Sequence, residues 1–228
     1  MATRLPDAGC DDVLLTDLYE LTMLQAYFDA GMNDVASFEF FVRGLSPQRS
    51  FLMAAGLQPV LDYLERVQFT DACIERLAGT DRFRPAFLAS LANLRFTGSV
   101  DALPEGTVCF ADEPILRITA PIREAQLVES RVMNLLHYAT LVASKAARAV
   151  LAARGRLLVD FGLRRAHGAG RPARAILRDF PAPRRCWPAC NTGFPPTARW
   201  RIRMCRRTTT RRWGSSILCA RSRITRCC

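Results

Sequence analysis

The first regular pattern of apolar positions predicts an amphipathic helix over residues 13–30. Asp17 and Glu20, three positions apart, fit the start of a helix, and Gly31 fits its end. Both ends of this helix are therefore marked. Its apolar residues stand three, four and seven positions apart, at Leu14, Leu18, Leu21 and Phe28.

A second helical pattern, interrupted by prolines and polar turns, runs through residues 57–94. The period holds over 57–77 and again over 87–94, with breaks expected at Pro59 and Pro85. The pattern then changes, because residues 96–121 are rich in Val, Thr, Ile and Phe and contain turn signals. We expect short antiparallel strands in that segment, after a helical layer.

A long helix is predicted from about residue 124 to residue 154, where Gly155 marks its end. The next segment, 156–162 (RLLVDFG), is a nearly continuous apolar run, typical of a strand buried on both faces. A helix that leads into a buried strand and a glycine-containing turn is how an α/β unit begins. Ligands of such units collect at the C-terminal end of the strand.

Charge is distributed unevenly and places a boundary near residue 170. From Arg171 onward there are 15 arginines and one acid, Asp179, a net charge of +14. The preceding part holds 17 basic and 20 acidic residues, a net charge of −3. The overall charge of +11 would usually suggest a nucleic-acid binder, but that inference requires the charge to be spread over one folded unit.

Targeting signals are not evident in the sequence. No apolar run is long enough for a membrane span, and the first residues lack the apolar stretch of a signal peptide. Cys10, Cys73 and Cys109 are isolated from one another, which fits buried thiols in a reducing compartment. We therefore expect a cytoplasmic protein without a membrane partner.

A few residues before the boundary are candidates for ligand binding. Arg164 and Arg165 follow the predicted buried strand, and guanidinium groups suit phosphate, although a solvated basic turn is the more ordinary explanation. Lys145, the single lysine, fits a surface position on the long helix. Tyr19 fits a half-buried core aromatic. Glycine-rich phosphate loops and nucleophile elbows of the common kinds are absent.

Four segments together resemble the nicotinate phosphoribosyltransferases in content and order, over nearly all of residues 12–168. The resemblance implies an enzyme of NAD salvage that joins nicotinate to 5-phosphoribosyl 1-diphosphate, giving nicotinate mononucleotide and diphosphate, with ATP hydrolysis coupled through a phosphohistidine. It also implies an α/β barrel beside a smaller α+β domain, in a homodimer with sites at its interface. The segments are LLTDLYELTM (14–23), FEFFVRGLSPQR (38–49), PEGTVCFADEPILRITAPIREAQLVESRVMNLLHYATLVASKAAR (104–148) and VDFGLRRAHG (159–168).

The resemblance assigns Tyr19 to stacking on nicotinate, and Arg164 and Arg165 to the phosphoribosyl and carboxylate groups. This suits the chemistry, because transfer at the anomeric carbon passes through a cationic sugar with a departing anion. ATP and Mg would be co-substrate and counter-ion; no covalent cofactor and no metal site on the protein are expected. No catalytic residue is assigned, since the family's Gly-Thr-x-Ala-His-Ser motif is absent and no histidine follows His167.

A slip of the coding frame near residue 170 would explain the composition of the last part. If the last base of each codon is read with the first two of the next, residues 178–193 can read GFSGTSTVLAGMQYG and residues 196–211 can read YGTMAHSYVQAHDDE. The second string contains the missing histidine motif. We therefore expect a frameshifted, inactive form of the enzyme. Three residues of the shifted reading are the same whichever synonymous codons the gene uses. They are Leu across the codons of Cys186 and Trp187, Ala across those of Trp187 and Pro188, and Val across those of Met204 and Cys205.

The predicted fold class is α/β, in three parts. Residues 1–122 form an α+β N-terminal domain, 123–169 begin a truncated phosphoribosyltransferase-type α/β barrel, and 170–228 are a frameshifted, disordered basic tail. The alternative is a natural arginine-rich arm that binds nucleic acid, but this would predict lysines alongside the arginines in a patterned charge face. The cysteines of the tail do not indicate a metal site, because no second pair of cysteines has the spacing found in zinc fingers.

Overall fold

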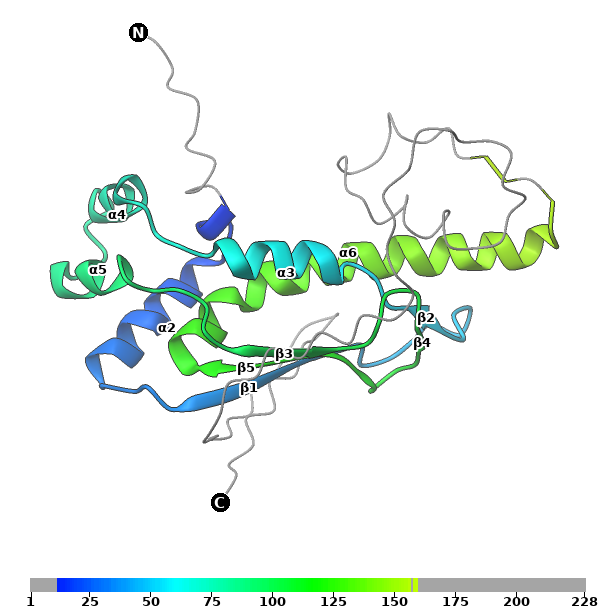
Figure 1. The fold of residues 1–228 in the computed structure, drawn as a ribbon, viewed down its shortest axis with the longest axis horizontal. Helices are drawn as coiled ribbons and strands as arrows, with labels where there is room; N and C mark the ends of the chain where they lie inside the picture. Colours follow the sequence, from blue (N-terminus) through cyan, green and yellow to red (C-terminus); the bar gives the residue numbers. More distant parts are fainter. Residues whose placement is uncertain (1–11, 157, 160–228) are drawn as a thin grey trace, which may run out of the picture.

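The computed structural model describes residues 12–156 and 158–159. Figure 1 shows helices α2, α3 and α6 beside a small sheet, with α4 and α5 at one end of the molecule. The elements in chain order are α2 (Leu18–Asp29), β1 (Val35–Phe41), β2 (Leu52–Met53), α3 (Leu57–Arg66), α4 (Asp71–Ala78), α5 (Pro85–Leu91), β3 (Ser99–Ala102), β4 (Val108–Cys109), β5 (Pro114–Pro121) and α6 (Ile122–Ala153).

The main sheet has three antiparallel strands in the order β1-β5-β3, and β2 pairs with β4 in a second, two-stranded sheet. Side chains alternate across a strand, so the two faces of the main sheet differ. On one face the Ser37 and Thr119 hydroxyls lie 2.8 Å apart and Arg117 pairs with Glu39. The other face is apolar and pairs Ala36 with Ala120, Phe38 with Ile118 and Phe40 with Leu116.

Helix α6 organises the core of the described part. It packs against α2, α3, β1, β2 and β5, and Leu24 of α2, Val60 of α3 and Leu127 of α6 meet in one buried cluster. Farther along, small alanines of α6 let the segment around β2 approach closely. Although α6 has 32 residues, neither it nor any other described helix is long and apolar enough to cross a membrane.

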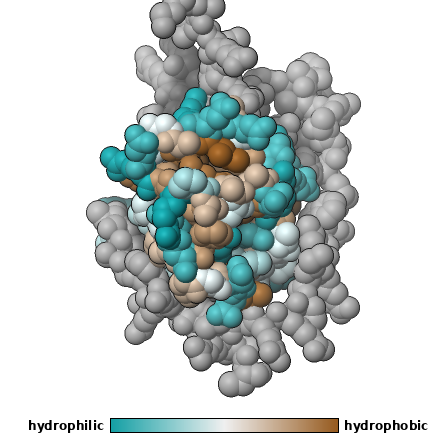
Figure 2. All heavy atoms as spheres, turned by 90° about the vertical axis from the view of Figure 1, so that its left-hand side faces the viewer, coloured by the Kyte–Doolittle hydropathy of each residue, from teal (hydrophilic) through white to brown (hydrophobic). Residues whose placement is uncertain are grey.

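Helix α5 packs onto the end of α2 through aromatic rings, and α4 packs against α5. The ring centroid of Phe87 lies 6.0 Å from that of Phe28 and 5.8 Å from that of Phe83. The guanidinium of Arg123 lies 5.1 Å from the centroid of Phe28, a cation–π contact that ties α6 to the same cluster. At this end, apolar atoms run down the middle of the surface with hydrophilic atoms on both sides (Figure 2).

The helix predicted over 13–30 exists as α2, but it starts later, and of the four predicted apolar positions Leu21 is buried and Leu14 and Phe28 pack against the core. Asp17 occupies the N-cap position without a side-chain capping bond. Leu18, assigned to the apolar face, is 49% exposed, whereas Glu20 is buried together with Leu21 and Leu24. The cause is α6, which offers polar partners to Glu20 that apolar spacing does not reveal.

The helical pattern over 57–94 is confirmed as α3, α4 and α5, but Pro59 does not break it. Pro59 lies in the first turn of α3, where a backbone N–H has no partner within the helix, and Pro85 is the first residue of α5. The antiparallel strands within 96–121 are confirmed as β3, β4 and β5. The predicted long helix is confirmed as α6, which ends where Arg154 and Gly155 adopt positive φ.

The buried strand predicted over 156–162 is absent where the structure describes this segment. Arg156, Leu158 and Val159 lie outside any helix or strand, and Leu158 and Val159 are 39% and 55% exposed. A strand buried on both faces needs neighbouring strands, and the two described sheets do not extend to this end of α6. The rest of the predicted strand and the predicted tail, 170–228, lie outside the described residues.

Candidate functional site

Tyr19 lies at the start of α2 with much of its side chain in solvent. It is 47% exposed, and Leu15 and Leu18 beside it in the chain are 55% and 49% exposed. Tyr19 is thus half-buried, as expected, but it belongs to none of the described core clusters. An aromatic ring beside uncovered aliphatic side chains suits a planar apolar ligand.

A polar network lies between α2 and α6, starting at the residue after Tyr19. Glu20 is fully buried; its Oε1 accepts a hydrogen bond from Ser130 Oγ at 3.0 Å, and its Oε2 accepts one from Gln126 Nε2. The same amide nitrogen donates to Glu129 Oε2 at 2.9 Å. Gln126 therefore bridges two carboxyl groups from different helices.

Two further side chains complete this network. Ser130 Oγ is also 3.0 Å from Asp17 Oδ2, and because a hydroxyl has one proton it can serve Asp17 or Glu20 but not both at once. The hydroxyl of Tyr27 donates to Gln126 Oε1 at 3.5 Å. The side chain of Asp17 is thus bonded to α6 rather than to the backbone of its own helix.

The network is acidic, and burial governs its protonation. Burial raises the pKa of Glu20. Burial, followed by the charges of Glu20 and Asp17, raises the pKa of Glu129 to about 7. The pKa of Tyr19 is raised by burial and then by the charges of Glu129 and Glu20, so the phenol keeps its proton.

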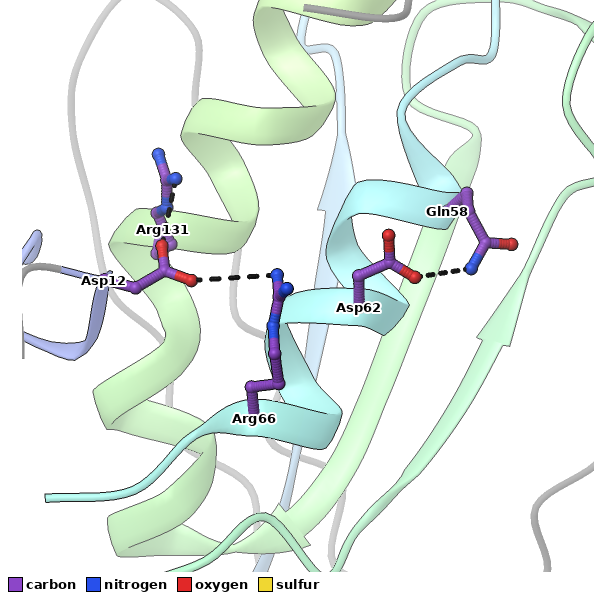
Figure 3. Close-up of polar contacts among 5 residues, drawn as sticks. All are labelled: Asp12, Gln58, Asp62, Arg66 and Arg131. Carbon is purple, nitrogen blue, oxygen red and sulfur yellow. Dashed lines mark hydrogen bonds and ion pairs between the residues drawn. The ribbon is translucent and has the colours of Figure 1, made fainter. Parts of the chain in front are cut away.

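Arg131 follows Ser130 in α6 but pairs with Asp12. Its guanidinium donates to Asn134 Oδ1 and to Asp12 Oδ1, both at 3.1 Å. Figure 3 shows Asp12 between Arg131 and Arg66 of α3, which lies 4.0 Å from the other oxygen of Asp12. The same view shows Gln58 bonded to Asp62 within α3. Asp12 therefore ties the segment before α2 to both α3 and α6.

The structure places Tyr19 but not its predicted companions. Arg164 and Arg165 lie outside the described residues, so their assignment to the phosphoribosyl and carboxylate groups stays a prediction. Lys145 is exposed on α6, as expected for a surface lysine. Cys73 and Cys109 are free and buried, which confirms the expectation for these two thiols.

Sequence reasoning missed the partners of α2 on α6. Gln126, Glu129 and Ser130 are three and four positions apart and therefore share a helix face. That face adjoins the apolar positions by which the long helix was predicted. The signal that could have identified them is the helical spacing of these polar residues next to the apolar face.

Comparison with known proteins identifies the family. The family model described as the N-terminal domain of nicotinate phosphoribosyltransferase (NAPRTase) matches residues 14–137, which is more than half of the chain. This range includes Tyr19 and the whole polar network between α2 and α6. The chain belongs to the nicotinate phosphoribosyltransferase family. The resemblance noted in the sequence is thereby confirmed.

Individual relatives agree with this assignment. Nicotinate phosphoribosyltransferase pncB2 of Mycobacterium tuberculosis is 54% identical over 155 residues, which cover 68% of this chain and 34% of that protein. The Bacillus subtilis nicotinate phosphoribosyltransferase is 39% identical over 155 residues, 68% of this chain and 32% of the relative. The chain thus spans about a third of the length of these curated relatives.

Solved structures show the same fold. Human nicotinic acid phosphoribosyltransferase aligns with a TM-score of 0.63 and 38% identity over 69% of this chain and 32% of that one. Nicotinate-nucleotide pyrophosphorylase from Pyrococcus furiosus aligns with a TM-score of 0.57 over 75% of this chain and 39% of that one. At 20% identity, the second likeness concerns the fold alone.

Proposed function

We propose that this chain is the N-terminal part of a nicotinate phosphoribosyltransferase of NAD salvage, in which Tyr19 binds the pyridine ring of nicotinate. The whole enzyme would join nicotinate to 5-phosphoribosyl 1-diphosphate, with ATP hydrolysis, and would act as a homodimer. The observation that carries the proposal is the half-exposed ring of Tyr19 inside the segment that matches the family. The 54% identity to the mycobacterial relative supports it.

The chemistry of the reaction explains why an aromatic side chain would be used. When the pyridine nitrogen bonds to the anomeric carbon, the ring gains a positive charge, and the face of an aromatic ring attracts a cation. Arg164 and Arg165 would supply the guanidinium groups for the anionic partner. A neutral phenol on Tyr19 adds no charge that would repel the carboxylate of nicotinate.

ATP and Mg²⁺ would be co-substrate and counter-ion in the whole enzyme. Within residues 12–156 and 158–159, no group of three or more His, Cys, Asp or Glu side chains is placed to hold a metal ion.

We propose further that the 228-residue chain does not form nicotinate mononucleotide, because the histidine motif is encoded in another frame after residue 170. The purified chain and a chain with the frame restored by one base would be assayed for nicotinate mononucleotide. We expect product from the restored chain only. Product from the printed chain would refute this part. Salt-sensitive DNA binding that is lost on deletion of residues 171–228 would instead favour an arginine-rich nucleic-acid-binding arm.

The role of Tyr19 is tested in the frame-restored chain. An aromatic contact contributes about 0.5–1.5 kcal/mol, so Tyr19→Ala is expected to raise the KM for nicotinate roughly two- to tenfold. Tyr19→Phe keeps the ring and should leave KM near that of the parent. If Tyr19→Ala leaves KM unchanged, Tyr19 does not bind the pyridine ring.

A further inference from the structure

Glu20, Gln126 and Glu129 form a joint between α2 and α6 that the proposed reaction does not use. Gln126 Nε2 donates to both carboxyl groups, and Gln126 and Glu20 are 4% and 0% exposed. A buried carboxylate is costly unless a cation or several donors compensate it. The donors to Glu20 are all neutral: the Gln126 amide, the Tyr19 hydroxyl and the Ser130 hydroxyl, which Glu20 shares with Asp17.

The charged groups around the joint do not neutralise it. Asp17 faces Glu20 from α2 and adds negative charge. From α3, Tyr63 lies close enough for the charge of Glu20 to raise the pKa of its phenol, after burial and Asp12. The guanidinium of Arg131 is bonded to Asp12 and Asn134. If Glu20 and Glu129 were both ionised, their carboxylates would therefore repel each other, with the Gln126 amide between them and no positive charge to compensate.

We propose that the joint of Glu20, Gln126 and Glu129 carries a proton at neutral pH and below, and that this proton holds α2, with Tyr19 at its start, against α6. Glu20 and Glu129 are then positioning residues for Tyr19. The importance of Tyr19 for nicotinate rests on the proposed function, whereas the proton-linked joint does not.

Protonation changes both the charge and the hydrogen bonding of the joint. A protonated carboxyl group becomes a donor and removes one of the two repelling charges. The direction of the pKa of Glu129, raised to about 7 mainly by burial, agrees with this. The Tyr19 hydroxyl is hydrogen-bonded to Glu20, and the charges of Glu129 and Glu20 raise the pKa of its phenol, so Tyr19 adjoins the joint.

The consequence for stability has a definite sign. A carboxyl group whose pKa is higher in the folded chain than in the unfolded chain binds more protons in the folded state. Between the ordinary value of 4.5 and about 7, stability should therefore fall as the pH rises, and above that window this contribution should be constant.

The 228-residue chain is tested by thermal unfolding from pH 5 to pH 8.5. The midpoint should fall between pH 5 and pH 7 and then level off, and Glu129→Gln should flatten this fall. Glu65→Gln, at an exposed position on α3, is the matched control and should keep the parental slope. A slope that Glu129→Gln leaves unchanged would overturn the proposal.

Carbon-13 NMR of the glutamate carboxyls and tyrosine rings gives a second readout that uses no substrate. One glutamate should titrate near pH 7 and disappear in Glu129→Gln, and the Tyr19 ring signal, assigned with Tyr19→Phe, should shift with the same midpoint. If every glutamate titrates near 4.5, the joint carries no proton. If the chemical shift of the Tyr19 ring does not change over this titration, Glu20 and Glu129 do not position Tyr19. Neither result depends on nicotinate binding, so each can fail separately from the proposed function.

Discussion

Gly56 shows at the residue scale how closely α3 approaches α6. Its φ is +100°, and a Cβ there would lie 2.8 Å from Ala139 Cβ and 2.9 Å from the Leu135 carbonyl oxygen. Gly56→Ala should therefore lower the free energy of unfolding by about 1–3 kcal/mol, measured by urea denaturation. Gly44→Ala, where a Cβ meets nothing within 4 Å, should change it by less than about 0.5 kcal/mol. Equal effects at both positions would contradict the close approach.

Some individual residues could be assigned from the sequence and others could not. Tyr19 was identified because it stands in a segment that resembles a known family, but its exposure depends on which face of α2 meets α6. Glu20 fitted a helix start, since Asp17 stands three positions before it. In the structure it does stand in the first turn of α2, but it is also a buried partner of Gln126 and Ser130. A cross-helix hydrogen bond of this kind leaves no local pattern in either segment.

Hydrogen bonds from side chains of α6 hold the segment around β2 at the scale of elements. Ser144 Oγ accepts from the Met53 backbone N–H at 2.9 Å and donates to the Thr140 carbonyl at 2.5 Å. Thr140 Oγ1 accepts from the Ala55 N–H at 3.3 Å and lies 3.2 Å from the Ala55 carbonyl. These bonds supply partners to a strand of two residues that has few of its own.

Removal of the Ser144 hydroxyl tests this attachment. Ser144→Ala leaves the Met53 N–H buried without its partner, which should lower the free energy of unfolding by about 1–3 kcal/mol. Hydrogen exchange at the Met53 amide should accelerate more than the global change in stability requires. Ser50→Ala, at an exposed position, serves as the control. Unchanged exchange at Met53 would show that Ser144 does not anchor β2.

Elements with local signals were predicted, and those that depend on distant partners were not. The boundaries of α6 agree with the sequence because its period is long and Gly155 ends it. Strand β1 was missed, although residues 35–41 read VASFEFF, because its inward and outward faces become evident only from its pairing with β5. The sequence predicts a break at Pro59, because a proline is tolerated only in the first turn of a helix and the start of α3 at Gly56 has no clear local signal.

The whole molecule combines a described part that matches a family with a C-terminal region that lies outside that match. Residues 14–137 match the N-terminal domain of the family, and the chain spans about a third of its curated relatives. The domain boundaries at 122/123 and 169/170 stay predictions. At the far end of α6, Leu151, Leu158 and Val159 are 62%, 39% and 55% exposed. In the whole enzyme we expect the continuing chain to cover them.

The proposed slip of the coding frame is tested by the nucleotide sequence of the gene from the codon of Ala166 to that of Arg211. We predict that an open frame, offset by one base, encodes GFSGTSTVLAGMQYG and then YGTMAHSYVQAHDDE across codons 178–211. The three residues forced by the code already agree with this reading. If the offset frame contains stop codons, or matches the family only at those three forced residues, the arginine-rich region is not displaced enzyme sequence and the account is wrong.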